Sequence, residues 1–263
     1  MKPLLITFGC SWTYGVGVGY TKGDSVTEYE KIAWNKKICN QFSWRGLLSK
    51  KYNLINANFA AGGSSNQKQF RLAKEFFSLK KIEHLKNNFG KILVVWGITS
   101  TARNEMWLLE SGKLVNFFYS DQNKSKLIEY LLKFHYDHDY EVQSLKTEIH
   151  HWNTFFKSLN IDNLWFDTFN HHNYDLPGLK LIQPIDNLLF NHENPRDLLS
   201  KLALNNGCQS MDDRYHTSNW NIDSNRVKYL SNCEILNPIS YHPTQLGHAQ
   251  IADMLSPYIE TFL

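Results

Sequence analysis

The chain has 263 residues, of which 42% are hydrophobic and 20% are charged, and its formal net charge is +3. This length suits one large α/β domain or two small ones, and the composition is that of a globular protein with a substantial core. The charge is too small to indicate a nucleic-acid-binding surface. No apolar run approaches the ~18 residues of a membrane span. We therefore expect neither nucleic acid nor a membrane as a partner.

The four cysteines are Cys10, Cys39, Cys208 and Cys233, and their spacing fits neither a metal-binding motif nor a disulfide framework. The N-terminus runs directly into a strand, without the basic segment, apolar stretch and cleavage site of a signal peptide. These features predict a cytoplasmic protein with free thiols.

Strands and helices alternate along the first hundred residues. Continuous apolar runs predict strands, and apolar side chains at helical spacing predict helices. A polar, glycine-rich segment is expected to form a loop. The predicted order is strand 3–8, loop 15–35, helix 36–51, strand 54–58, helix 66–86 and strand 91–97.

The same alternation continues with longer interruptions. We expect residues 100–140 to form a loop plus a helix over 120–136, and residues 170–240 to be a long insertion or loop-rich segment with a helix near 195–205. The remaining expected elements are helix 144–159, strand 163–169 and helix 244–262. This order predicts a single domain over 1–263, a flavodoxin-like three-layer α/β/α sandwich with a central parallel sheet.

Three residues follow directly on predicted strands. Ser11 comes after the first strand, Gly63 after the second and Thr99 after the third. Ligands of parallel α/β sheets bind outside the carboxyl ends of the strands, so these residues are expected at one site. Near the other end of the chain, His242 stands just before the last predicted helix. A serine at a strand end and a histidine are the two halves of an acyl-transfer site.

Four short blocks resemble the SGNH (GDSL-like) hydrolases. The first, residues 8–15, contains Ser11 between Gly9 and Gly15 and looks like the nucleophile block. Residues 58–66, 94–99 and 242–248 follow in the family's order and look like its second, third and C-terminal blocks.

The resemblance implies a serine esterase or acetylesterase that needs no cofactor. On this reading Ser11 attacks a small ester, such as an O-acylated carbohydrate, and His242 is the general base. The backbone N–H groups of Ser11 and Gly63 would stabilise the oxyanion. Two other functions fit the same residues: transfer of the acyl group to a sugar alcohol, and non-catalytic binding by a protein of this fold.

Two positions depart from the family's pattern. Thr99 stands where the family has an asparagine that donates to the oxyanion, and Asn104 is a nearby candidate to replace it. Ile239 stands where the family has the aspartate that orients the histidine. His242 would then be held by Ser240, Asp212, Asp213, Asp223 or a backbone carbonyl, which favours a Ser–His dyad over a full triad.

The remaining candidates are weaker. Cys10 is expected to face the core, since neighbouring residues of a strand point to opposite faces. Histidine pairs, such as His150-His151 and His171-His172, have no visible third ligand, so no metal site is predicted. Trp12 and Tyr14 flank Ser11 and are expected to border the pocket. The sequence does not determine the oligomeric state.

Overall fold

The computed structural model describes residues 1–108, 112–118, 126–168, 188–189, 198–206 and 233–263. Its centre is a five-stranded sheet in the order β2-β1-β3-β6-β7, and the four neighbouring pairs are all parallel. Taken along the sheet's own strands, this is the 2-1-3-4-5 order of flavodoxin-like folds. The strands are β1 (Leu4–Phe8), β2 (Ile55–Asn58), β3 (Ile92–Ile98), β6 (Asp162–Asp167) and β7 (Leu188–Leu189).

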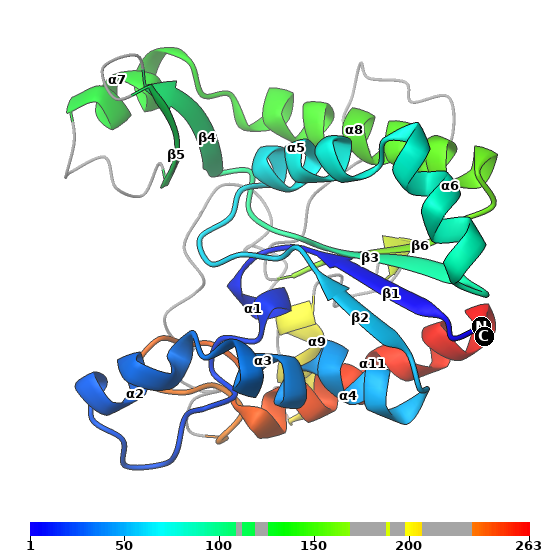
Figure 1. The fold of residues 1–263 in the computed structure, drawn as a ribbon. Helices are drawn as coiled ribbons and strands as arrows, with labels where there is room; N and C mark the ends of the chain where they lie inside the picture. Colours follow the sequence, from blue (N-terminus) through cyan, green and yellow to red (C-terminus); the bar gives the residue numbers. More distant parts are fainter. Residues whose placement is uncertain (109–111, 119–125, 169–187, 190–197, 207–232) are drawn as a thin grey trace.

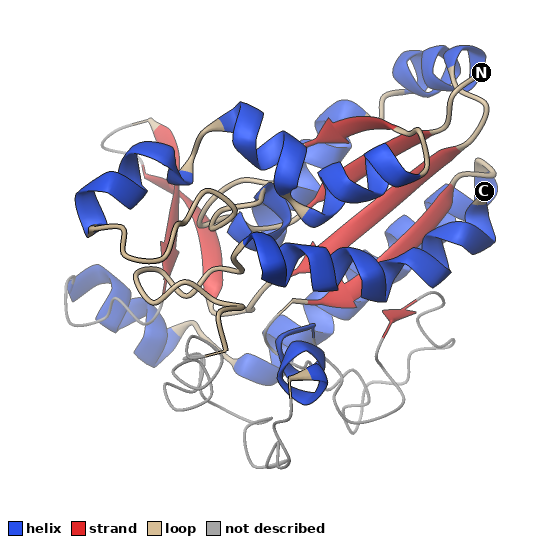
Figure 2. Cartoon of the chain, turned by 90° about the horizontal axis from the view of Figure 1, so that it is seen from below, coloured by secondary structure: helices blue, strands red, loops and turns tan. Residues whose placement is uncertain are grey.

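Helices cover both faces of the sheet (Figures 1 and 2). One face carries α5 (Asn66–Phe76), α6 (Leu79–Asn88) and α8 (His138–Ser158), drawn above the sheet in Figure 1. The opposite layer contains α3 (Lys36–Phe42), α4 (Trp44–Lys51), α9 (Leu198–Asn205) and α11 (Gln245–Phe262). The predicted three-layer sandwich with a central parallel sheet is confirmed.

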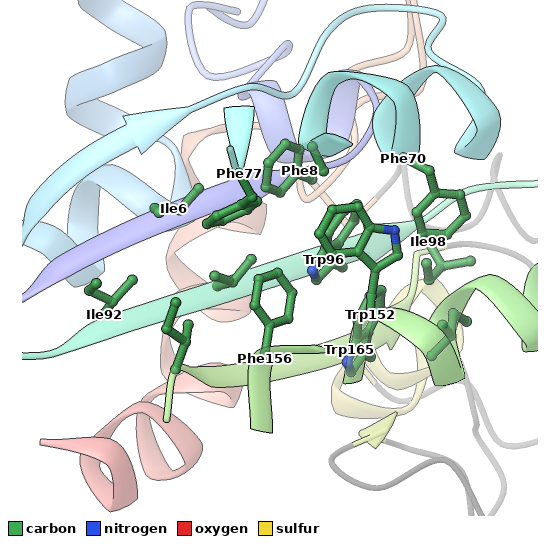
Figure 3. Packing of buried hydrophobic residues seen from close by; sticks show 14 of the residues in the cluster. Ile6, Phe8, Phe70, Phe77, Ile92, Trp96, Ile98, Trp152, Phe156 and Trp165 are labelled. Atoms are coloured by element: carbon green, nitrogen blue, oxygen red, sulfur yellow. The ribbon is translucent and has the colours of Figure 1, made fainter. Parts of the chain in front are cut away.

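Alternation along each strand divides the core into two. On β1, Leu5 packs toward α4 and α11, whereas Ile6 and Phe8 pack toward α5, α6 and α8. The second cluster is rich in aromatic rings (Figure 3). Trp96 lies at its centre, stacked on Phe8 and on Trp165 with ring centroids 4.3 and 4.8 Å apart. These two packed layers hold the strands, and therefore the carboxyl ends of the sheet, in fixed register.

Two predicted helices are each divided in two. Ser43 ends α3 and also caps α4, where its hydroxyl accepts from the Gly46 N–H. Ser78 caps α6 in the same way, two residues after α5 ends. A serine hydroxyl can satisfy a free N–H group at the start of a new helix, so a helix can end and another begin at each serine. The periodic apolar spacing continues across both breaks, which is why one long helix was predicted in each case.

A helix and a hairpin, in two different segments, were not predicted. The segment expected as a loop over 15–35 contains α2 (Val26–Ala33), which begins with a capping box between Ser25 and Glu28. The segment 100–140 contains the antiparallel hairpin of β4 (Arg103–Leu108) and β5 (Lys113–Phe118), where only a loop was expected. The helix that follows, α7 (Lys126–Phe134), lies within the predicted helix 120–136. Within the described ranges, no helix is long and apolar enough to cross a membrane.

Candidate active site

Ser11 begins a four-residue helix, α1 (Ser11–Tyr14), at the carboxyl end of β1. Gly9 and Cys10 make the turn between them, and Gly9 has a φ of +152°. Parallel pairing brings the carboxyl ends of β2, β3 and β6 to the same edge of the sheet. Ser11 itself is almost completely buried. The nucleophile candidate therefore lies where ligands of such sheets bind.

His242 lies within hydrogen-bond distance of Ser11. The distance from His242 Nε2 to Ser11 Oγ is 2.7 Å, although the two residues are 231 positions apart in the chain. This contact is inside the range needed for a base to take a proton from a hydroxyl.

The other nitrogen of His242 meets a hydroxyl instead of a carboxylate. Nδ1 is 2.9 Å from Ser240 Oγ, and Ser240 Oγ donates to Asn237 Oδ1 over 3.0 Å. Tyr29 OH lies 2.8 Å from Ser240 Oγ and accepts from Asn237 Nδ2 at 3.4 Å. A hydroxyl has one proton. Because Ser240 gives its proton to Asn237, its lone pairs face Tyr29 and His242.

This network determines the tautomer of His242. With a lone pair of Ser240 facing it, Nδ1 carries the ring proton and donates to Ser240 Oγ. Nε2 is then the acceptor and faces the hydroxyl of Ser11. Nε2 is thus the acceptor of the ring, and the described group that faces Nδ1 is a hydroxyl.

Burial and, to a lesser extent, the positive charge of Arg103 together lower the pKa of His242 to about 4, although a hydrogen bond to the Ser240 backbone acts in the opposite direction. Arg103 begins β4, and its guanidinium group is bonded to the Cys10 side chain beside Ser11. At neutral pH the imidazole is therefore uncharged, which is the protonation state that a general base requires.

A short closed loop holds His242 before α11. A bridge pairs Leu236 with Pro243, and the Asn237 N–H donates to the carbonyl of His242 at 2.9 Å. Thr244 then caps α11, accepting from Gly247 N. Gly17, with a φ of +105°, packs against the loop so closely that a Cβ there would lie 2.2 Å from the Pro243 carbonyl oxygen. A side chain at position 17 would therefore displace His242.

The turn after β2 is tied to the turn of Ser11. Gln69, a buried residue of α5, accepts from Gly9 N at 3.0 Å and donates to Ser64 Oγ. Ala61 N donates to the Gly9 carbonyl at 3.2 Å. Gly63 lies inside this turn with a φ of +63°, a conformation that favours glycine.

Thr99 is held by Asn66, the first residue of α5. The Asn66 side chain accepts from Thr99 N at 3.0 Å and donates to the Thr99 carbonyl at 2.8 Å. This bond pair connects the carboxyl end of β3 to the start of α5. Asn66 uses its amide to position the backbone of Thr99.

The remaining residues predicted for the pocket, Asn104, Trp12 and Tyr14, make their described contacts with side chains other than Ser11 and His242. The Asn104 side chain is hydrogen-bonded to the Glu141 carboxyl on α8. Trp12 is buried in the core beside Cys10, which faces the core as expected. Tyr14 is partly exposed, and its ring packs against Trp34 with centroids 5.8 Å apart.

Some sequence candidates cannot be placed. Asp212, Asp213, Asp223, His171 and His172 lie outside the described residues. Among the residues that are described, no three His, Cys, Asp or Glu side chains gather where they could hold a metal ion.

Five residues that contribute to the site were missed in the sequence: Tyr29, Asn66, Gln69, Arg103 and Asn237. Asn237 has the clearest signal, because Asn-Pro before a histidine block marks a turn whose side chain can bond nearby backbone. Tyr29 lies in the segment that was expected to be a loop, so it had no predicted orientation.

Comparisons with known proteins give little further information. No family model matches the chain, and no curated protein matches it. Among solved structures, the chain is similar to a carbohydrate esterase whose active site is described as having divergent catalytic and non-catalytic binding functions. The alignment covers 98% of this chain and 68% of that one, at 12% identity and a TM-score of 0.42. A likeness of this size carries no argument about chemistry.

Proposed function

We propose that this protein is a serine esterase of the SGNH type, which hydrolyses a small ester such as an O-acylated carbohydrate. The observation that carries the proposal is the 2.7 Å contact between His242 Nε2 and Ser11 Oγ. The position of this pair at the carboxyl edge of a parallel sheet supports it further.

The reaction uses two half-reactions at Ser11. Ser11 Oγ attacks the ester carbonyl while His242 Nε2 takes its proton. The tetrahedral intermediate collapses, the acyl C–O bond breaks, and His242 returns the proton to the leaving alcohol. Water then attacks the acyl-enzyme in the same way, releasing the acid and restoring Ser11.

The oxyanion donors we propose are the backbone N–H groups of Ser11 and Gly63. Ser11 is the first residue of α1, and the first N–H groups of a helix have no carbonyl partner within it. Each such donor contributes roughly 3 kcal/mol to lowering the barrier. We propose that Thr99, which stands in the third of the four blocks, lines the same pocket.

In this proposal Ser240 takes the role of the family's aspartate, although Ile239 stands at the aspartate's position. Ser240 orients His242 and selects its tautomer, but a neutral hydroxyl stabilises the imidazolium less than a carboxylate does. We therefore expect a slower enzyme than one with a full Ser–His–Asp triad.

The test is turnover of p-nitrophenyl acetate and labelling by a fluorophosphonate probe, in the parent protein and in two variants. Ser11→Ala should lower kcat/KM by roughly 1,000-fold or more and abolish labelling, because it removes the nucleophile. Ser240→Ala should lower kcat/KM by about 10-fold, since less orientation is lost than with an ionised aspartate.

Each remaining outcome selects a different function. If the parent protein neither turns over the ester nor reacts with the probe, hydrolysis is excluded and a non-catalytic binding role takes its place. If release of the acyl group is accelerated by an added sugar alcohol, the protein is an acyltransferase.

A further inference from the structure

An exposed aromatic residue, Trp34, lies beside the turn that contains Gly63. Trp34 directly follows α2 and is 52% exposed. Its ring packs against Tyr14 at an interplanar angle of 51°, and Tyr14 lies three residues after Ser11. Two aromatic side chains from different segments therefore meet at the surface next to the nucleophile's helix.

The indole of Trp34 lies directly on the backbone of Gly62. A Cβ at Gly62 would be 2.1 Å from Cη2 and 2.4 Å from Cζ3 of the ring. Only glycine permits this approach. Gly62 precedes Gly63, and the same turn is joined to the Ser11 turn through the bond from Ala61 N to the Gly9 carbonyl. The ring is thus supported from one side by the turn proposed to bind the oxyanion.

The open part of the indole suits one kind of ligand. A purely apolar acyl group gains free energy mainly by leaving water on all sides, which a half-exposed ring does not offer. A pyranose ring has one face of C–H groups and a rim of hydroxyls, so it can lie on an aromatic surface while its hydroxyls stay hydrated. Aromatic side chains with an apolar face and a wet edge are suited to such contacts.

We propose that Trp34 and Tyr14 form an aromatic platform that binds the sugar ring of an O-acylated carbohydrate next to Ser11. The inference rests on the proposed esterase function for the chemical step, but the binding that it describes is separable from turnover. It assigns to Trp34, a residue that no motif of the chain indicates, the role of determining substrate specificity.

The first test compares two substrates, an O-acetylated methyl pyranoside and p-nitrophenyl acetate. Trp34→Ala should lower the ratio of kcat/KM for the sugar ester to that for p-nitrophenyl acetate by about 10-fold, mainly through KM, and Trp34→Phe should recover much of it. The matched control is Trp107→Ala. Trp107 is 55% exposed, on β4, and its removal should leave the ratio unchanged. An unchanged ratio in Trp34→Ala, or a loss that Trp107→Ala matches, overturns the proposal.

The second test measures binding without catalysis. Acetylated gluco-, manno- and xylo-oligosaccharides are titrated against Ser11→Ala, with tryptophan fluorescence as the signal. Quenching or enhancement that disappears in Ser11→Ala/Trp34→Ala supports the platform, even if the parent protein hydrolyses nothing and the esterase proposal fails. Absence of a fluorescence change with all three sugars, or a change that persists without Trp34, overturns the proposal.

Discussion

His242 receives its orientation from uncharged groups alone among the contacts described. Ser240, Asn237 and Tyr29 satisfy one another with one assignment of protons, and that assignment leaves Nε2 of His242 free to accept from Ser11. Burial lowers the pKa of the imidazole most, and the positive charge of Arg103 lowers it in the same direction. Burial and the charge of Arg103 are therefore the two causes that lower the pKa of the His242 imidazole.

This arrangement predicts an unusual pH profile. The acid limb of kcat/KM reports the pKa of the base in the free enzyme, so activity should be half-maximal near pH 4. Removing the charge with Arg103→Met should move this limb upward by roughly one pH unit, since a nearby like charge no longer disfavours the imidazolium. Arg103→Lys keeps the charge and is the control. An identical acid limb in Arg103→Met and the parent protein would contradict the assignment.

At the scale of elements, Arg45 of α4 connects α3 and α4 to α1, the short helix that begins with Ser11. It is buried, and its guanidinium donates to the carbonyls of Thr13 and Tyr14 at 3.0 and 2.8 Å and to Asn40 Oδ1 at 2.9 Å. Burial lowers its pKa to about 10, so the group stays charged at neutral pH. The last carbonyls of α1 have a partner from a neighbouring helix because this side chain reaches them.

Replacing Arg45 should therefore destabilise the fold around α1. We expect Arg45→Met to lower the free energy of unfolding in urea by about 3 kcal/mol, because three acceptors lose a charged donor and the two carbonyls are left in the interior. Lys22→Gln is the control, since it breaks only the exposed ion pair with Glu234 and should change stability little. Equal stability of Arg45→Met and the parent protein would show that these bonds are dispensable.

At the scale of the whole molecule, two buried histidines make stability depend on pH. His248 of α11 is completely buried, its Nδ1 accepts from Trp44 N, and burial lowers its pKa to about 3. His242 behaves alike, with a pKa of about 4. Both are neutral when folded and have an ordinary pKa near 6.5 when unfolded, so the unfolded chain binds more protons below pH 6.5.

The free energy of unfolding should consequently fall as pH drops from 6.5 toward 4. Each such histidine contributes a slope of up to about 1.4 kcal/mol per pH unit. His248→Gln should show a shallower slope in this window, measured by urea unfolding at several pH values. His151→Gln replaces an exposed histidine of α8 and should keep the parent's slope. The same slope in both variants would exclude His248 as a source of acid sensitivity.

Patterns of apolar residues and helix caps in the sequence predicted some elements of the fold but not others. The buried strands β1 and β3 are continuous apolar runs, and the serine that caps α5 is visible in the sequence. The hairpin β4-β5 escaped prediction because its strands lack a clean apolar alternation. The breaks at Ser43 and Ser78 escaped it because apolar spacing continues through them, whereas only the capping geometry marks the new helix.

The sequence by itself established the layered α/β architecture, the place of Ser11 at a strand end, and His242 as the histidine before the last helix. These follow from local periodicity and from the rule that parallel strands end at one edge. Distances between remote segments follow from packing and cannot be read along the chain. Folding determined that Ser240 orients His242, that Asn66 clamps Thr99, that Trp12 is buried, and that Trp34 rests on Gly62. The contacts of Asn66 with Thr99 and of Trp34 with Gly62 join segments that are remote in the chain, and the loop of Ser240 and His242 meets Ser11 only when the two layers close on the sheet.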